Sequence, residues 1–173
     1  MNKLHLFILI FIALPNVYSD DVIVPNDWKR HEVIVEGFTP FFVYLPSGYG
    51  INIDRKQTSG TGAWATHIIN YNNRPVGGIF FGNFIPDYVL WGINDEQLNH
   101  ISIKVFNNLI SMKVFEENNT YKFEYCFIDF TNNQDEKYIH LWGGSAFYNG
   151  VLGISEETKN VLMKVFSTME IIN

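Results

Sequence analysis

The chain contains 173 residues, of which 18 are acidic and 12 are basic, so its formal net charge at pH 7 is −6. This acidic balance argues against nucleic acid and anionic membrane surfaces as partners, because both repel a negatively charged protein. Cys126 is the single cysteine, which excludes an internal disulfide and leaves packing to stabilise the fold. Because Cys126 lies in the apolar run FEYCFIDF, we expect a buried, unreactive thiol.

Residues 1–19 have the pattern of a cleaved secretory signal peptide. Lys3 precedes an apolar run that is about half the ~20 residues of a membrane-spanning helix. Val17 and Ser19 occupy the positions where small side chains are wanted for cleavage before residue 20. We therefore predict a signal peptide over 1–19 and one domain over 20–173, exported to the periplasm without a membrane anchor. A retained anchor is the alternative.

Alternation of apolar residues predicts the first strands of the domain. Residues 31–36 alternate, and so do residues 41–45 and 49–53. Pro46 and Gly48 suit a type I turn between the last two segments, which therefore predict a β-hairpin.

A second antiparallel pair is predicted over residues 63–71 and 76–84, with a turn at 72–75. Gly77 and Gly78 lie within the second of these strands. Because glycine weakens a strand, the two residues indicate a bulge or a close approach by another backbone.

A helix is predicted next, ending near residue 107. Asn94 can cap it, two acidic residues follow in its first turn, and Leu98, Ile101 and Val105 come at helical spacing. The β-branched content of this segment counts against a helix.

Residues 110–115, 121–130 and 137–142 predict a three-stranded antiparallel meander, because turn-rich breaks separate them at about ten-residue spacing. The middle strand is aromatic on one face, which we expect to be covered. That face carries Tyr121, Phe123, Tyr125 and Phe127.

The remaining elements complete an α+β fold. Residues 143–153 predict a long glycine-rich loop, Ser155 can cap an amphipathic helix, and residues 170–172 can add a terminal strand. The predicted architecture is therefore an antiparallel β-sheet packed with two helices.

Two segments, FFVYLPSGYGI and VLMKVFSTMEI, are similar to the opening hairpin and the closing helix of the PsbP-like α/β sandwich. An oxygen-evolving photosystem subunit, a Ran-binding import factor and the bacterial envelope protein DcrB share that fold. The resemblance implies a scaffold used mostly for binding. The PsbP-like architecture is also similar to that of some periplasmic immunity proteins, which block cell-wall-degrading effectors such as those of type VI secretion.

The sequence carries no catalytic signature and no metal-binding motif. Its histidines beyond the signal peptide are isolated, and only His67, Asp129 and His140 suggest themselves as an enzyme site. Asp54 and Asp129 lack the spacing of an EF-hand loop, so calcium is open but unsupported. We therefore predict a protein that is not an enzyme and needs no cofactor.

Two aromatic segments, 84–91 and 145–152, are the candidate contact surface, because aromatic anchors within a polar rim are typical of tight protein interfaces. The alternative is that these rings pack onto the core. Acidic residues including Asp95 and Glu96 would favour fast association with a basic partner. The predicted partner-binding residues are Asp87, Tyr88, Trp91, Phe147, Tyr148 and Asn149.

The leading hypothesis is a non-enzymatic periplasmic immunity protein that covers the active cleft of a basic, cell-wall-degrading effector. The alternative is a DcrB-like envelope accessory or a small-ligand-binding module with a pocket between sheet and helices. Dimerisation is left open.

Overall fold

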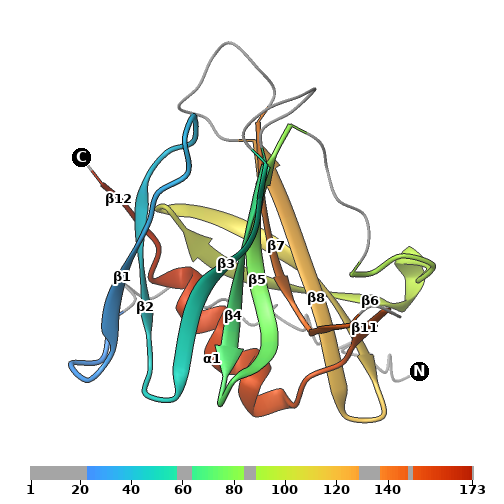
Figure 1. Cartoon of the computed structure of the whole chain (residues 1–173). Helices are drawn as coiled ribbons and strands as arrows, with labels where there is room; N and C mark the ends of the chain where they lie inside the picture. The colour runs from blue at the N-terminus through green and yellow to red at the C-terminus, as the bar shows by residue number, and fades with distance from the viewer. Residues whose placement is uncertain (1–22, 58–63, 84–88, 129–136, 148–149, 173) are drawn as a thin grey trace, which may run out of the picture.

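The computed structural model describes residues 23–57, 64–83, 89–128, 137–147 and 150–172. The predicted signal peptide lies outside these residues. The described strands pair in antiparallel fashion. They form a seven-stranded sheet, which we call the larger sheet, and a three-stranded sheet, the smaller sheet, with one α-helix packed against both (Figure 1). Among the described helices, none combines the length and the apolar character that a bilayer crossing requires.

The larger sheet contains seven of the described strands in the order β3-β4-β5-β9-β8-β7-β6. Three of its hairpins turn on residue pairs with positive φ: Asn72–Asn73, Phe106–Asn107 and Asn118–Asn119. Two consecutive positive φ angles define the type I′ turn, whose twist matches that of paired strands, and asparagine tolerates this conformation well. The strands are β3 (Tyr49–Gln57), β4 (Trp64–Tyr71), β5 (Arg74–Gly82), β6 (Leu98–Val105), β7 (Asn108–Glu117), β8 (Thr120–Ile128) and β9 (Tyr138–Gly143).

The predicted pair β4–β5 and the predicted meander β7–β8–β9 are confirmed. The glycines of β5 also behave as predicted. A Cβ atom at Gly77 would lie 2.6 Å from the backbone oxygen of Trp142, and one at Gly78 would lie 2.5 Å from that of His67. The register of β4 and β5 shifts next to this pair, between Ile69 and Asn70.

The predicted helix ending near residue 107 is wrong, because this segment forms the edge strand β6. Asp95–Gln97 make one 3-10 turn, η1, and the chain is extended from Leu98 onward. Ile101, Ile103 and Val105 alternate with polar residues, and the turn at Phe106–Asn107 then pairs β6 with β7. The β-branched, period-two pattern therefore prevails over the helical spacing.

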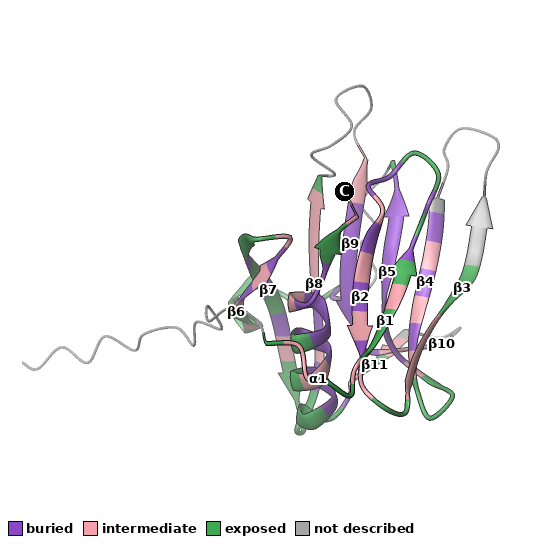
Figure 2. Ribbon diagram, turned by 90° about the vertical axis from the view of Figure 1, so that its left-hand side faces the viewer, coloured by how far each residue is buried: buried purple, intermediate pink, exposed green. Residues whose placement is uncertain are grey.

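The smaller sheet shows that the predicted hairpin of residues 41–45 and 49–53 is also wrong. Both segments are strands, joined by a turn with Gly48 at φ +83° and a hydrogen bond from Tyr49 N to Pro46 O. They do not pair, because β2 joins the smaller sheet and β3 joins the larger one (Figure 2). The smaller sheet has the order β1-β2-β12, with β1 (Lys29–Val33), β2 (Phe41–Leu45) and β12 (Glu170–Ile171).

Helix α1 (Glu156–Ser167) is confirmed at its predicted cap, where Ser155 Oγ accepts a hydrogen bond from Thr158 N at 3.3 Å. It is the only α-helix among the described residues. The fold class is therefore corrected from a sheet with two helices to a mostly β fold of two sheets and one helix. The expected first helix is missing because its residues are strand β6.

Two apolar clusters lie on opposite faces of the larger sheet. The main core fills the space between the larger sheet, the smaller sheet and α1, with Phe41, Phe81, Phe123 and Phe166 at or near full burial. A smaller cluster of Val89, Leu90 and Trp142 covers the outer face. Trp142 lies on Gly78, where a Cβ atom would come within 2.8 Å of its ring, so the missing side chain leaves room for the indole.

The predicted loop over residues 143–153 is largely a hairpin. Strands β10 (Ser145–Phe147) and β11 (Gly150–Leu152) pair in antiparallel register after Gly144, which has φ +150°. Glycine content hides this pairing in the sequence, because glycine has a low strand propensity.

Candidate functional site

Of the six predicted partner-binding residues, the structure describes the side chain of one, Trp91. Its side chain is 80% exposed, which is rare for an indole. Phe147 ends strand β10, and nothing is described of its side chain. Asp87, Tyr88, Tyr148 and Asn149 lie outside the described residues.

A tight turn explains why Trp91 faces solvent. Ile93 N donates to Leu90 O at 3.1 Å, and Gly92 has φ +79°, so residues 90–93 form a turn with Trp91 at its second position. Val89 and Leu90 are buried in the outer cluster on Trp142. The turn is thus fixed by its apolar base while Trp91 projects from it.

The two sequence segments chosen as the contact surface meet at this cluster. Val151 of β11 packs on the same group of residues as Val89 and Leu90. Its neighbour Leu152 is 62% exposed. We call Trp91, Leu152 and the segments that carry them the outer surface. The structure therefore brings residues 89–93 and 150–152 to one face of the larger sheet.

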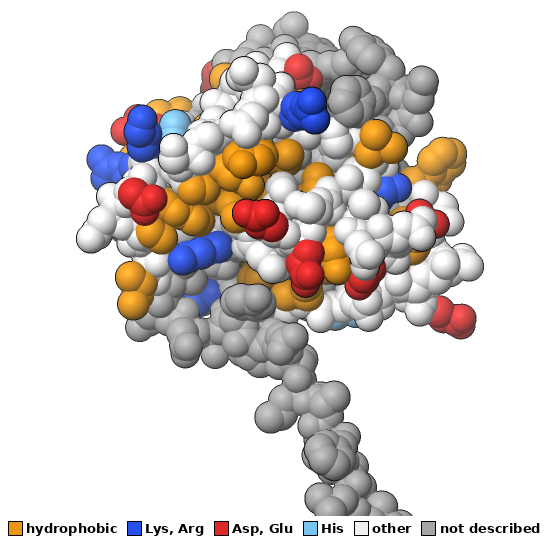
Figure 3. Space-filling model, turned by 90° about the horizontal axis from the view of Figure 1, so that it is seen from below, with side chains coloured by type: hydrophobic (Ala, Val, Ile, Leu, Met, Phe, Trp, Pro, Cys, Tyr) orange, Lys and Arg blue, Asp and Glu red, His pale blue; other side chains and the backbone are white. Residues whose placement is uncertain are grey.

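Acidic groups stand directly after the turn. Asp95 and Glu96 occupy η1 and are exposed, and Asp95 Oδ1 contacts Lys113 Nζ at 3.5 Å. Such an exposed pair contributes little to stability, so its carboxylate remains available to a partner. Acidic side chains also stand beside apolar ones on the underside of the molecule (Figure 3).

The histidines considered as an enzyme site do not come together. His67 and Leu141 both lie opposite Ile79 in neighbouring strand pairs, so these three side chains point to the inner face. His140 is the next residue to Leu141 and lies opposite Phe80, so it points to the outer face. Asp129 lies outside the described residues. His67 and His140 therefore cannot belong to one enzyme site, because they lie on opposite faces of the larger sheet.

On the outer face, His140 instead pairs with Glu124, a contact that the sequence pattern does not indicate. His140 Nε2 contacts Glu124 Oε2 at 3.0 Å, and His140 is 1% exposed. Cys126 lies opposite His140 in the ladder. Burial, with a smaller effect of Glu124, raises the pKa of Cys126 to about 11, which holds the thiol protonated at neutral pH. The expected burial of this thiol is thus only partial, and its raised pKa favours the low reactivity that the sequence predicts.

The described residues contain no group of three or more histidine, cysteine, aspartate or glutamate side chains that could hold a metal ion. On the inner face, desolvation lowers the pKa of His67 to about 4. His67 packs edge-on against the ring of Phe81, with ring centroids 5.5 Å apart. It is therefore a neutral core residue at physiological pH.

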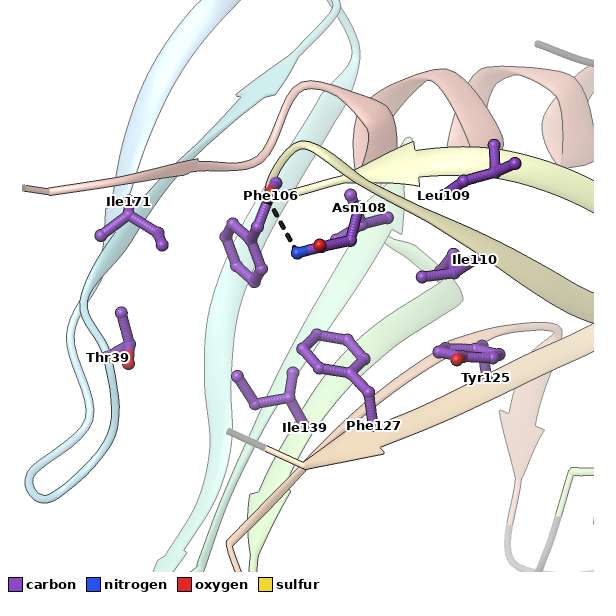
Figure 4. A pocket seen from close by; sticks show the side chains of 10 residues that line it. Thr39, Phe106, Asn108, Leu109, Ile110, Tyr125, Phe127, Ile139 and Ile171 are labelled. Atoms are coloured by element: carbon purple, nitrogen blue, oxygen red, sulfur yellow. Dashed lines mark hydrogen bonds between the residues drawn. The ribbon is translucent and has the colours of Figure 1, made fainter. Parts of the chain in front are cut away.

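An apolar cavity of about 250 Å³ opens between the two sheets (Figure 4). Tyr125 and Phe127 of β8 form one wall, and the β6–β7 turn contributes Phe106. Thr39 and Ile171 face these rings from the smaller sheet's side. We call this cavity the inner pocket. The complete lining is Thr39, Val105, Phe106, Asn108, Leu109, Ile110, Tyr125, Phe127, Ile139 and Ile171.

The alternative hypothesis expects a pocket between sheet and helices, whereas the inner pocket lies between the two sheets. Its position could not be predicted because its lining comes from five separate segments. The aromatic face of β8 was the available signal: Tyr121 and Phe123 are covered as expected, whereas Tyr125 and Phe127 are only half-buried. Tyr125 and Phe127 are only partly covered because they line the inner pocket.

Comparisons of the chain with protein-family models, with curated proteins and with solved structures found no match. The functional assignment therefore depends on the chain's own residues.

Proposed function

We propose that this chain is an exported, non-enzymatic binding protein that docks a protein partner through the outer surface. In its specific form, it is a periplasmic immunity protein that covers the active cleft of a basic, cell-wall-degrading effector. The observation that carries the proposal is Trp91, an exposed indole on a turn with a buried base. Tryptophan is strongly enriched among residues that dominate binding energy, and a fixed turn lowers the entropy lost on docking.

The charge of the chain supports a basic partner. The protein is acidic overall, and Asp95 and Glu96 follow Trp91 within five residues. Carboxylates at the rim of an interface speed encounter with a positively charged protein and make the association rate depend on salt.

The first test is genetic and biochemical. Deleting the gene should sensitise the source cell to killing by its siblings, and the purified chain should inhibit a wall-degrading enzyme recovered from them. A deletion strain with unchanged sensitivity, together with a purified chain that inhibits no such enzyme, would reject the immunity role.

The second test addresses the surface. With the enzyme in hand, Trp91→Ala should weaken binding by at least about 30-fold, the loss typical of a central tryptophan. The matched control is Ile53→Ala, which changes an exposed apolar residue on β3 and should leave affinity within about twofold. Equal affinities for the two variants would place the interface elsewhere. Unfolding temperatures of both variants should match that of the parent protein.

Ligand binding is the second candidate function, and the inner pocket is the observation that favours it.

A further inference from the structure

The inner pocket exists because the cover over β8 ends halfway along the strand. Phe123 is fully buried and meets Phe166 of α1, with ring centroids 6.2 Å apart. Tyr125 and Phe127 continue the same row of rings but are only half-buried. They face a cavity whose far side is formed by Thr39 and Ile171 (Figure 4). The two sheets are therefore not closed against each other at this end.

The pocket walls are fixed by contacts of their own. Asn108 Nδ2 donates to the backbone oxygen of Phe106 at 3.1 Å and holds the β6–β7 turn. The Phe106 ring meets Phe41 edge-to-face at 5.2 Å and Phe127 at 6.0 Å. A cavity that is formed before binding loses little entropy on binding.

The lining determines the chemistry of the ligand. None of the ten residues around the pocket carries a charge, so an ion would lose its hydration without a compensating partner. Three aromatic side chains, Phe106, Tyr125 and Phe127, present edges and faces to the space. Aromatic rings prefer edge-to-face and offset partners of this kind.

The size of the cavity limits the ligand further. At about 250 Å³ it exceeds the ~150 Å³ cavity that accepts benzene and falls below the ~300 Å³ of the smallest drug-sized sites. We propose that the inner pocket binds a small uncharged aromatic molecule of one or two fused rings. The pocket belongs to the inner face, so its occupancy is independent of docking at the outer surface.

Indole is a suitable probe, and two related compounds test the chemistry. Titration of the full domain should give a Kd of about 0.1–1 mM for indole, in line with the affinity expected of a ligand this small. Indole-3-acetate should bind at least about tenfold more weakly because its carboxylate is charged. Hexanol of similar size should also bind more weakly. Equal affinity for indole-3-acetate or for hexanol would overturn the assignment to neutral aromatic ligands.

The location is tested by a matched pair of variants and by nuclear magnetic resonance. Leu109→Glu places a charge at the pocket, whereas Leu152→Glu places it on the outer surface, and the two leucines are 63% and 62% exposed. The first variant should weaken indole binding about tenfold and the second should not change it. In the parent protein, indole should shift the signals of Phe127 and Ile139. Shifts confined to other residues, or the same shifts produced by raising protein concentration alone, would refute the proposal.

Discussion

His67 should make the stability of the fold depend on pH in the acidic range. The histidine lies on the inner face of β4, is 5% exposed and has a pKa lowered from 6.5 to about 4 by burial. In the unfolded chain it takes up a proton near pH 6.5, whereas in the folded protein it stays neutral until about pH 4. The unfolded state therefore binds more protons below pH 6.5. The stabilisation is complete above that pH and is lost progressively as the pH falls towards 4.

The size of the effect follows from the shift. Each pKa unit corresponds to about 1.4 kcal/mol, and at pH 4 the folded protein is itself partly protonated. The His67 contribution should therefore fall by about 2–3 kcal/mol between pH 7.5 and pH 4. Replacing His67 with leucine removes the titrating group and keeps an apolar side chain against Phe81.

Urea unfolding of the parent protein and of His67→Leu at several pH values measures the difference. Carboxylates and other histidines, including the partly buried His31, titrate in both proteins and so cancel in the comparison. The parent should lose about 2–3 kcal/mol more than the variant over this range, seen as an extra drop of about 1–2 M in the urea midpoint. His100→Gln, a change at an exposed histidine, should follow the parent. Parallel curves for the parent and His67→Leu would show that the buried imidazole is not the cause.

Three further changes test separate parts of the fold. Gly143→Ala would place its Cβ 2.1 Å from the buried Phe123 ring and should destabilise the protein by about 2–3 kcal/mol in urea unfolding. The control Gly50→Ala meets no atom within 4 Å and should change stability by less than about 0.5 kcal/mol. Ser155→Ala removes the cap of α1 and should lower the free energy of unfolding by about 1 kcal/mol, measured by thermal or urea unfolding. Cys126 should react with a disulfide reagent at pH 8 about 100-fold more slowly in the folded than in the urea-unfolded protein, because its pKa is raised to about 11. Comparable rates would contradict the raised pKa of the thiol.

The strands could be predicted from the sequence where local turn chemistry and alternation agree. Asn72–Asn73 and Asn118–Asn119 adopt the left-handed conformation that their residue type favours, and the strands on both sides were found. Phe106–Asn107 adopts the same conformation, but phenylalanine does so rarely. The sequence therefore gives no clear signal for the turn between β6 and β7, and the helical spacing of a few apolar residues in 98–105 predicts a helix instead.

The partners of β2 could not be predicted, because this pairing depends on contacts between distant segments. Residues 41–45 and 49–53 are adjacent and alternating, so a hairpin satisfies every local rule. In the fold, β2 is instead held by β1 and by β12, and Tyr44 N donates to Thr168 Oγ1 across 124 residues of sequence. Local pattern indicates that a segment is a strand, whereas the packing of α1 and the chain after it determines the partner.

The candidate sites show the same division. Parts of the two aromatic segments, residues 89–93 and 150–152, meet on Trp142, whereas the orientation of Trp91 depends on the turn at Gly92. The two faces of the sheet decide which histidines can meet, and that requires the register. His67 and His140 were a reasonable pair in sequence and are separated by the sheet itself.

The separation of the two apolar clusters has a consequence for function. Val89, Leu90 and Trp142 form a cluster apart from the main core, so the turn bearing Trp91 can change sequence without disturbing the packing of α1 between the sheets. Gly78 cannot change in the same way, because any side chain there would meet both the indole of Trp142 and the backbone of β4. The proposed docking surface can therefore change in sequence, while the strand beneath it must keep its glycine. Such a scaffold would suit the proposed immunity role, in which the contact residues vary and the strands beneath them do not.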